Sequence, residues 1–188
     1  MKFYIPDNFE EPLDENPKSI KRWHIIFHLI KKNNLKFFVE IGTATGKTSY
    51  SLLSNIDNIH VTTIDPYKFY PSYVDGKSNQ SILDNLRIKA QRTLQPFVKE
   101  GRCKMINLFS DQAAEQIQST DMVFIDANHS YEYVKKDIEI YMPKIKKGGI
   151  LCGHDYKAYE GVTKAVNEIA KNLQVNYASD YFWYTYKK

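Results

Sequence analysis

The sequence predicts an α/β fold, a single-domain three-layer sandwich in which a mostly parallel sheet has helices on both faces. Short apolar runs typical of buried strands alternate along the chain with segments whose apolar residues recur at helical spacing. The 188 residues are enough for one domain with its own core. Two strand-like runs close the sequence without a helix between them, which predicts an antiparallel C-terminal strand pair.

The order of the elements follows from the same patterns. Residues 1–16 are expected to form an irregular lead-in, and the folded domain is expected to cover residues 17–188. Asn16 and Pro17 are residue types that begin helices, so the first helix is predicted to start there. Further helices are predicted at residues 78–95, 130–142 and 161–173. Strands are predicted at residues 37–41, 61–64, 103–108, 122–125, 150–152, 175–177 and 181–186.

Composition limits the classes of partner. There are 26 basic and 22 acidic residues, a formal charge of +4, and lysines lie beside acids, so no nucleic-acid-binding stripe is expected. No apolar run approaches the roughly 18 residues of a membrane span, and no secretion signal is evident. Cys103 and Cys152 lie in apolar runs, as buried free thiols of a reducing compartment do. We expect a cytoplasmic protein with a small-molecule partner, and the sequence leaves a homo-oligomer open.

A glycine turn follows the first predicted strand. Gly42 and Gly46 frame this turn, and Gly46-Lys47-Thr48 is similar to the end of the phosphate loop of nucleotide triphosphatases. That loop needs four residues between its glycines, whereas three stand here. Glu40 at the strand end would also repel a triphosphate but suits a cationic ligand. A P-loop-like ATPase is therefore a disfavoured alternative, and the turn is interpreted as a ligand-holding turn.

Polar residues follow each of the five central strands. Parallel sheets bind ligands at the carboxyl ends of their strands, so these residues are the candidates for a site. Some also have an ordinary structural explanation: an Asp-Pro turn for Asp65, a helix cap for Ser110 and Asp111, and packing for His129 and His154. The candidates are Glu40, Asp65, Ser110, Asp111, Asp126, Asn128, His129, His154 and Asp155.

Four segments together resemble class I, Rossmann-like S-adenosylmethionine-dependent methyltransferases. They are residues 38–46, 63–66, 123–131 and 147–156, and the resemblance extends over roughly residues 20–170. The segments that contain Asp126 and His154-Asp155 resemble the subgroup with many small-molecule and sugar O-methyltransferases. The resemblance implies an enzyme whose cofactor is S-adenosyl-L-methionine. A catalytically silent subunit that only binds this cofactor is the second alternative.

The resemblance also implies roles for the candidate residues. Glu40 and the turn residues Gly42, Thr43 and Gly46 would hold the methionine part of the cofactor. Asp65 would accept hydrogen bonds from the ribose hydroxyls. Ser110 and Asp111 would lie near the adenine, and Asp126 would lie close to the transferred methyl group.

A hydroxyl acceptor must lose its proton, and two arrangements could remove it. In the first, Asp126, His154 and Asp155 bind a divalent cation such as Mg²⁺ that lowers the pKa of the hydroxyl. This set departs from the metal-dependent relatives, because His154 stands in place of an oxygen ligand and Asn128 in place of a further acid. In the second, neutral His129 or His154 acts as a general base without metal. The predicted catalytic residues are therefore Asp126, His129, His154 and Asp155.

Overall fold

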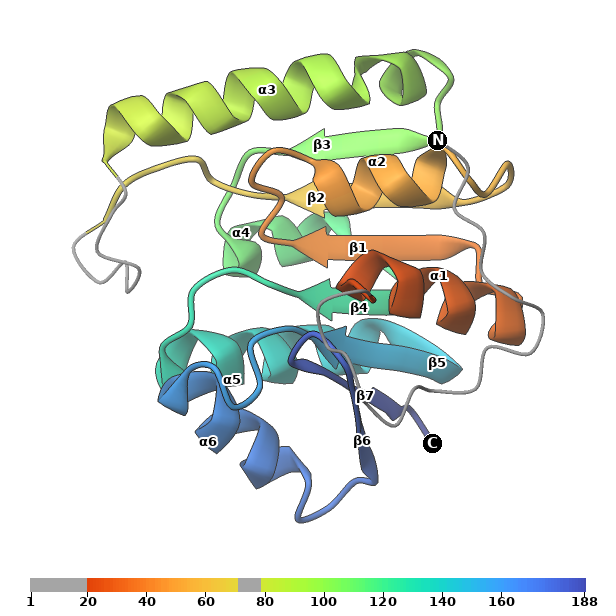
Figure 1. Cartoon of the computed structure of the whole chain (residues 1–188), viewed down its shortest axis with the longest axis vertical. Coiled ribbons are helices and arrows are strands. Elements are labelled where there is room, and N and C mark those ends of the chain that lie inside the picture. The colour runs from red at the N-terminus through yellow and green to blue at the C-terminus, as the bar shows by residue number, and fades with distance from the viewer. Residues whose placement is uncertain (1–19, 71–78) are drawn as a thin grey trace.

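The computed structural model describes residues 20–70 and 79–188, and it shows one seven-stranded sheet with the strand order β3-β2-β1-β4-β5-β7-β6 (Figure 1). The first five strands in the chain are parallel, and β7 is antiparallel to both β5 and β6. This confirms the predicted fold class. The strands are β1 (Phe37–Ile41), β2 (His60–Ile64), β3 (Cys103–Ile106), β4 (Thr120–Ile125), β5 (Ile145–Gly153), β6 (Val175–Ala178) and β7 (Phe182–Tyr186).

Helices cover both faces of the sheet and form two apolar layers. On one face lie α1 (Arg22–Asn33), α2 (Lys47–Leu53) and α3 (Gln80–Lys99). On the other lie α4 (Ser110–Ala113), α5 (Tyr131–Tyr141) and α6 (Glu160–Ile169), with the short 3-10 helices η1 (Ala114–Gln116) and η2 (Met142–Lys144).

Alternating side chains of the central strands enter the two layers. Met122 and Phe124 of β4 pack against the α1 side, whereas Val123 and Ile125 pack against the α5 side. A strand that is buried on both faces cannot alternate between apolar and polar residues, which is why β4 reads as a continuous apolar run. Strands β2 and β3 lie on one side of β1, and β4 and β5 lie on the other, so the strand order reverses between β1 and β4. Sheets of this class bind ligands in the crevice at such a reversal.

Several predicted boundaries are wrong; among them, α6 ends at Ile169 and not at residue 173, and β3 ends at Ile106 and not at residue 108. Helix α1 begins at Arg22, after Lys21 in an extended conformation, and not at Pro17; Asn16 and Pro17 lie outside the described residues, as does the predicted lead-in. Helix α3 continues through Pro96 to Lys99, because a proline this close to the helix end removes only one backbone hydrogen bond.

Strand β5 begins five residues earlier than predicted. Gly148 and Gly149 lie within the strand, at an irregularity in its register with β4. A Cβ atom on Gly149 would lie 2.4 Å from the carbonyl oxygen of Asp121. Gly149 therefore lets the two strands approach closely.

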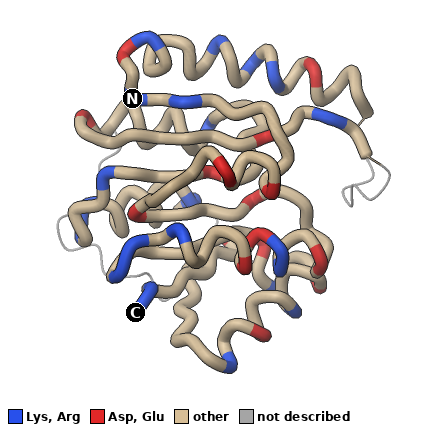
Figure 2. Tube along the Cα trace, turned by 180° about the vertical axis from the view of Figure 1, so that it is seen from behind, with Lys and Arg blue, Asp and Glu red and all other residues tan. Residues whose placement is uncertain are grey.

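Charge is distributed unevenly between the two edges of the sheet (Figure 2). Lysines collect where the parallel strands begin and β7 ends: Lys36, Lys146, Lys147, Lys187 and Lys188. Carboxylates collect where the parallel strands end: Glu40, Asp65, Asp111, Asp126, Asp155 and Asp180. Within the described ranges, no helix is both long and apolar enough to cross a membrane.

Candidate active site

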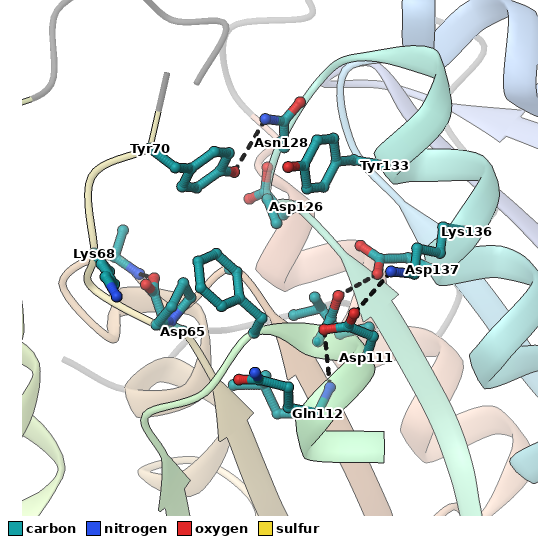
Figure 3. Close-up of a pocket in the computed structure, with 18 of the residues that line it drawn as sticks. Asp65, Lys68, Tyr70, Asp111, Gln112, Asp126, Asn128, Tyr133, Lys136 and Asp137 are labelled. Carbon is teal, nitrogen blue, oxygen red and sulfur yellow. Dashed lines mark hydrogen bonds and ion pairs between the residues drawn. The ribbon is translucent and has the colours of Figure 1, made fainter. Parts of the chain in front are cut away.

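A cavity of about 380 Å³ opens at the carboxyl ends of β1, β2 and β4 (Figure 3). The chain segments that follow these strands form its floor, and α4 and α5 form its far wall. Of the predicted cofactor residues, five line the cavity: Gly42, Asp65, Ser110, Asp111 and Asp126. Glu40, Thr43 and Gly46 belong to the same strand end and turn but are not part of the lining.

Gly42 allows the turn after β1 to lie against the end of β4. Its φ is +92°, and a Cβ atom there would lie 2.0 Å from the carbonyl oxygen of Asp126. Both the left-handed backbone and the lack of space require glycine at this position. Gly46 also has a positive φ, of +78°, and is the N-cap of α2, so Lys47 and Thr48 lie in the first turn of that helix.

Asp65 holds the glycine turn in place through backbone amides. Its Oδ2 atom accepts hydrogen bonds from the amides of Thr43 and Ala44 at 3.1 and 3.0 Å, and its Oδ1 accepts one from Tyr67 at 2.9 Å. The Tyr67 hydroxyl closes the ring by donating to the Ala44 carbonyl at 2.9 Å. Burial raises the pKa of Asp65, and the three amides oppose that shift. The carboxylate thus shapes the turn while it lines the cavity.

Glu40 is buried beneath the turn, with 2% of its surface exposed. The Ser49 hydroxyl of α2 donates to its carboxyl oxygen Oε2. Burial raises the pKa of Glu40 to about 8, further supported by the nearby charge of Asp126 and opposed by Ser49 and Arg22. The hydroxyl of Thr43, in the same turn, is buried without a hydrogen-bond partner among the described residues. This corner of the site therefore has polar groups that a ligand could satisfy.

Ser110 and Asp111 form the far wall of the cavity, and the Ser110 hydroxyl does not cap α4. It donates instead to the carboxyl group of Asp137 on α5. Asp111 accepts from Lys136 at 2.7 Å and from the backbone amide of Gln112 at 2.9 Å. Figure 3 shows Asp111, Lys136 and Asp137 together on this side of the cavity.

Asp137 is a buried cavity residue that the sequence analysis missed. It is 4% exposed, and burial raises its pKa to about 7. The available signal was its helical position, because Asp137 falls between Val134 and Tyr141 on the apolar stripe of α5. An acid on a buried stripe indicates a specific partner, which here is the Ser110 hydroxyl.

The mouth of the cavity is aromatic. Tyr70 contacts the rings of Phe109 and Tyr133 at centroid distances of 5.5 and 5.6 Å. The Asn128 amide donates to the Tyr70 hydroxyl at 3.0 Å and accepts from the amide of Ser130 at 2.8 Å (Figure 3). Asn128 thus joins the β4–α5 turn to the segment after β2.

The structure brings together the four predicted catalytic residues at the ends of β4 and β5. His129 Nε2 lies 2.9 Å from Asp155 Oδ2, and the His129 ring stacks on Tyr159 at 4.1 Å. His154 Nδ1 lies 3.0 Å from Asp155 Oδ1 and 3.9 Å from Asp126 Oδ1. Asp155 is thereby placed between the two histidines.

These contacts shift the pKa values of the cluster. Burial acts to lower the pKa of His154, but its contacts with Asp155 and Asp180 and the charge of Asp126 outweigh burial and raise the pKa to about 9. Burial acts to raise the pKa of Asp155, and the two histidines overcome it and hold that pKa well below its usual range. Burial raises the pKa of Asp126, against the opposing charges of Arg22 and His154.

Two further residues at this cluster were missed by the sequence analysis. Asp180, in the turn between β6 and β7, has Oδ2 3.6 Å from His154 Nε2. Arg22, the first residue of α1, has Nε 3.4 Å from Asp126 Oδ2. Asp180 could have been found from the predicted antiparallel strand pair, whose turn falls beside the end of β5. Arg22 carried no signal, since the sequence placed it inside a longer helix.

Asp126, His154 and Asp155 form a donor set that fits a divalent cation. One ligand atom from each lies within 4.8 Å of the others. Both ring nitrogens of His154 are buried without an aligned hydrogen bond, and its contact with Asp155 is an ion pair. A bound cation would have to displace a proton from this ring before one of its nitrogens could act as a ligand. An imidazole together with two carboxylates suits Mn²⁺, Fe²⁺ or Zn²⁺ better than Mg²⁺, which prefers oxygen ligands alone.

Comparison with known proteins agrees with this geometry. A family model described as a methyltransferase domain matches residues 39–156, more than half of the chain, so the chain belongs to this family. Its fold is that of the class I, S-adenosylmethionine-dependent methyltransferases. The matched range contains the glycine turn, Asp65, Asp126 and the His154-Asp155 pair.

Individual proteins resemble the chain over most of its length. Protein R132 of Acanthamoeba polyphaga mimivirus is 27% identical over 177 residues, which cover 86% of this chain and 74% of R132. A Staphylococcus aureus protein with a proposed caffeoyl-CoA O-methyltransferase activity has a TM-score of 0.69 at 23% identity, covering 95% of this chain and 86% of that one. The O-methyltransferase from Bacillus cereus, solved with SAH, has a TM-score of 0.62 at 15% identity, covering 94% and 84%. At these identities, the two solved structures establish a shared fold.

Proposed function

We propose that this methyltransferase transfers the methyl group of S-adenosylmethionine to an oxygen atom of a small molecule or sugar. The observation that carries the proposal is the juxtaposition of the 380 Å³ cavity with the cluster of Asp126, His154 and Asp155. Asp126 belongs to both. A cofactor in the cavity would therefore lie beside groups able to activate an acceptor hydroxyl.

The cavity residues supply a place for each part of the cofactor. Asp65 keeps acceptor capacity for ribose hydroxyls, because each carboxylate oxygen has two lone pairs and its amide bonds use only three in total. Ser110 and Asp111 on the far wall are assigned to the adenine end. Glu40, whose ionisation burial opposes, would regain its charge beside the cofactor's ammonium group.

Methyl transfer leaves a neutral thioether and places the methyl group on the acceptor oxygen, whose proton must leave. A divalent cation bound by Asp126, His154 and Asp155 would supply the positive charge that lowers the pKa of the hydroxyl. Asp155 also contacts His129, and Asp180 faces His154. These contacts would orient Asp155 and His154 as metal ligands. The metal-free alternative makes His129 the base, oriented by Asp155.

The charge distribution supports a small acceptor rather than a nucleic acid. The exposed lysines Lys36, Lys146 and Lys147 lie at the opposite edge of the sheet from the cluster. The acidic site edge would repel a phosphate backbone. Cys103 and Cys152 are free and buried, which supports the expected cytoplasmic location. The domain limits at residue 17 and the homo-oligomer stay predictions.

The proposal is tested by calorimetry and by an acceptor screen with methyl-labelled S-adenosylmethionine. We expect S-adenosylhomocysteine to bind, and transfer to small hydroxyl compounds to be lost with a chelator and restored by Mn²⁺. Asp126→Asn and Asp155→Asn should each remove transfer and leave cofactor affinity within about threefold. Asp57→Asn, an exposed acid at the other edge, is the control for removal of one charge.

Each contrary result has a distinct meaning. Transfer that persists in chelator eliminates the cation and leaves the histidine base. Cofactor binding without transfer to any acceptor favours the non-catalytic subunit. Absence of cofactor binding contradicts the proposal as a whole.

A further inference from the structure

The guanidinium group of Arg22 lies beside Asp126, a residue that lines the cavity, and its Nε atom has no hydrogen-bond partner among the described residues. This nitrogen is buried, and no aligned acceptor exists for it among residues 20–70 and 79–188. It forms an ion pair with Asp126 Oδ2 at 3.4 Å. A buried charged donor without an acceptor has an unfavourable free energy, so a ligand that accepts a hydrogen bond from Arg22 would be stabilised there.

Arg22 lies close to two buried carboxyl groups, one from each of the strands that flank the reversal in the sheet. Asp126 ends β4, and Glu40 lies on β1 directly before Gly42. Arg22 forms an ion pair with Asp126 at 3.4 Å, and its charge also acts on Glu40. The site therefore places a fixed cation beside a carboxyl group at the turn that holds the amino-acid end of the cofactor.

We propose that Arg22 binds the α-carboxylate of the methionine part of S-adenosylmethionine. This inference rests on the proposed function, since it needs the cofactor in the cavity. An amino-acid group carries one ammonium and one carboxylate, and it requires an anion and a cation side by side. Glu40 supplies the anion and Arg22 the cation. A planar guanidinium can bind a carboxylate through two parallel hydrogen bonds, which a lysine cannot do.

The position of Arg22 is fixed by the fold before any ligand binds. Its backbone amide donates to Asp180 Oδ2 at 2.9 Å, which ties the first residue of α1 to the β6–β7 turn. The helix behind it packs on the sheet through four buried side chains: Ile25, Ile26, Leu29 and Ile30. A donor held in this way loses little conformational entropy when it binds its ligand.

The experiment compares two ligands that differ only in the carboxylate, S-adenosylhomocysteine and its decarboxylated form, by calorimetry. The wild type should bind S-adenosylhomocysteine about 10- to 100-fold more tightly, the usual effect of a hydrogen bond between charged groups. In Arg22→Met, that preference should fall below about threefold, with the decarboxylated ligand nearly unaffected. Arg22→Lys should keep an intermediate preference. Lys32→Met, on an exposed position of the last turn of α1, should keep all of it.

The outcomes separate the inference from the proposed function. If the wild type binds neither ligand, the proposed function fails and the inference falls with it. If it binds S-adenosylhomocysteine but does not distinguish the two ligands, the inference alone is wrong, and no variant is needed for that conclusion. An equal loss of affinity for both ligands in Arg22→Met would show a structural role for Arg22 and would also overturn the inference. Urea midpoints for each variant confirm that the folded proteins are compared.

Discussion

Replacing Asp65 by asparagine tests whether one carboxylate both shapes the glycine turn and holds the cofactor. In the wild type, the two oxygens of Asp65 accept from three backbone amides, those of Thr43, Ala44 and Tyr67. Asparagine has the same shape but only one oxygen. If that oxygen faces Thr43 and Ala44, the NH₂ group faces the Tyr67 amide, and two donors then oppose each other.

The magnitude follows from this count. One buried amide left without an acceptor costs about 1–3 kcal/mol. If the cost falls on the turn that forms the cofactor site, affinity for S-adenosylhomocysteine should fall about 5- to 140-fold. Because the same amides are bonded in the absence of ligand, any part of this cost that the ligand-free protein already bears lowers the free energy of unfolding instead of the affinity.

Calorimetry with S-adenosylhomocysteine at pH 8 and urea denaturation of the ligand-free protein measure the two effects. Asp57→Asn removes the same charge from an exposed position and should change neither quantity. A dissociation constant within twofold of wild type, together with an unchanged urea midpoint, would refute the reasoning. Lower affinity at unchanged stability would instead mean that the carboxylate contacts the cofactor without supporting the turn.

Three further predictions concern other parts of the molecule. Gly42→Ala should reduce cofactor affinity more than tenfold and lower the urea midpoint, because its Cβ atom would overlap the Asp126 carbonyl at 2.0 Å; normal binding would contradict the packing described. Burial raises the pKa of Asp137 from 3.8 to about 7 in the folded state, so the unfolded chain loses that proton first. Wild-type stability should therefore fall relative to that of Asp137→Asn as the pH rises from about 4 to 7. Urea midpoints of both proteins at pH 5 and 8 measure this; the same change of midpoint in wild type and variant would contradict it. Cys103 and Cys152 are buried, and burial raises both thiol pKa values. A disulfide reagent at pH 8 should modify them only as fast as the protein unfolds. Immediate labelling would contradict the buried position of these thiols.

The order of strands and helices along the chain, and the strand ends that form the candidate site, could be predicted because they depend on local patterns. Continuous apolar runs such as β4 and polar residues such as Asp126 directly after them require no knowledge of long-range contacts. The hydrogen-bond partners of individual polar groups could not be predicted in the same way. The sequence offered capping for Ser110, whereas its hydroxyl bonds Asp137, a residue 27 positions away. Such a pairing depends on how α4 and α5 pack together.

The same limit explains why Arg22 and Asp180 were missed. They are 158 residues apart along the chain, and a hydrogen bond from the backbone amide of Arg22 to the side-chain carboxylate of Asp180 joins them. Neither residue belongs to a motif, and each reaches the cluster only because the sheet places its element at that edge. By contrast, His154 and Asp155 follow a strand directly, and their position could be predicted from its end.

The separation of charge between the two sheet edges (Figure 2) has a consequence for turnover. S-adenosylmethionine carries one net positive charge at neutral pH, and S-adenosylhomocysteine carries none, because the sulfonium becomes a thioether. An edge lined by Asp65, Asp126, Asp155 and Asp180 attracts the reactant electrostatically but not the product. Methyl transfer removes the ligand charge on which this attraction acts, so the product is bound less tightly than the reactant. Added salt should narrow the difference in affinity between the two molecules.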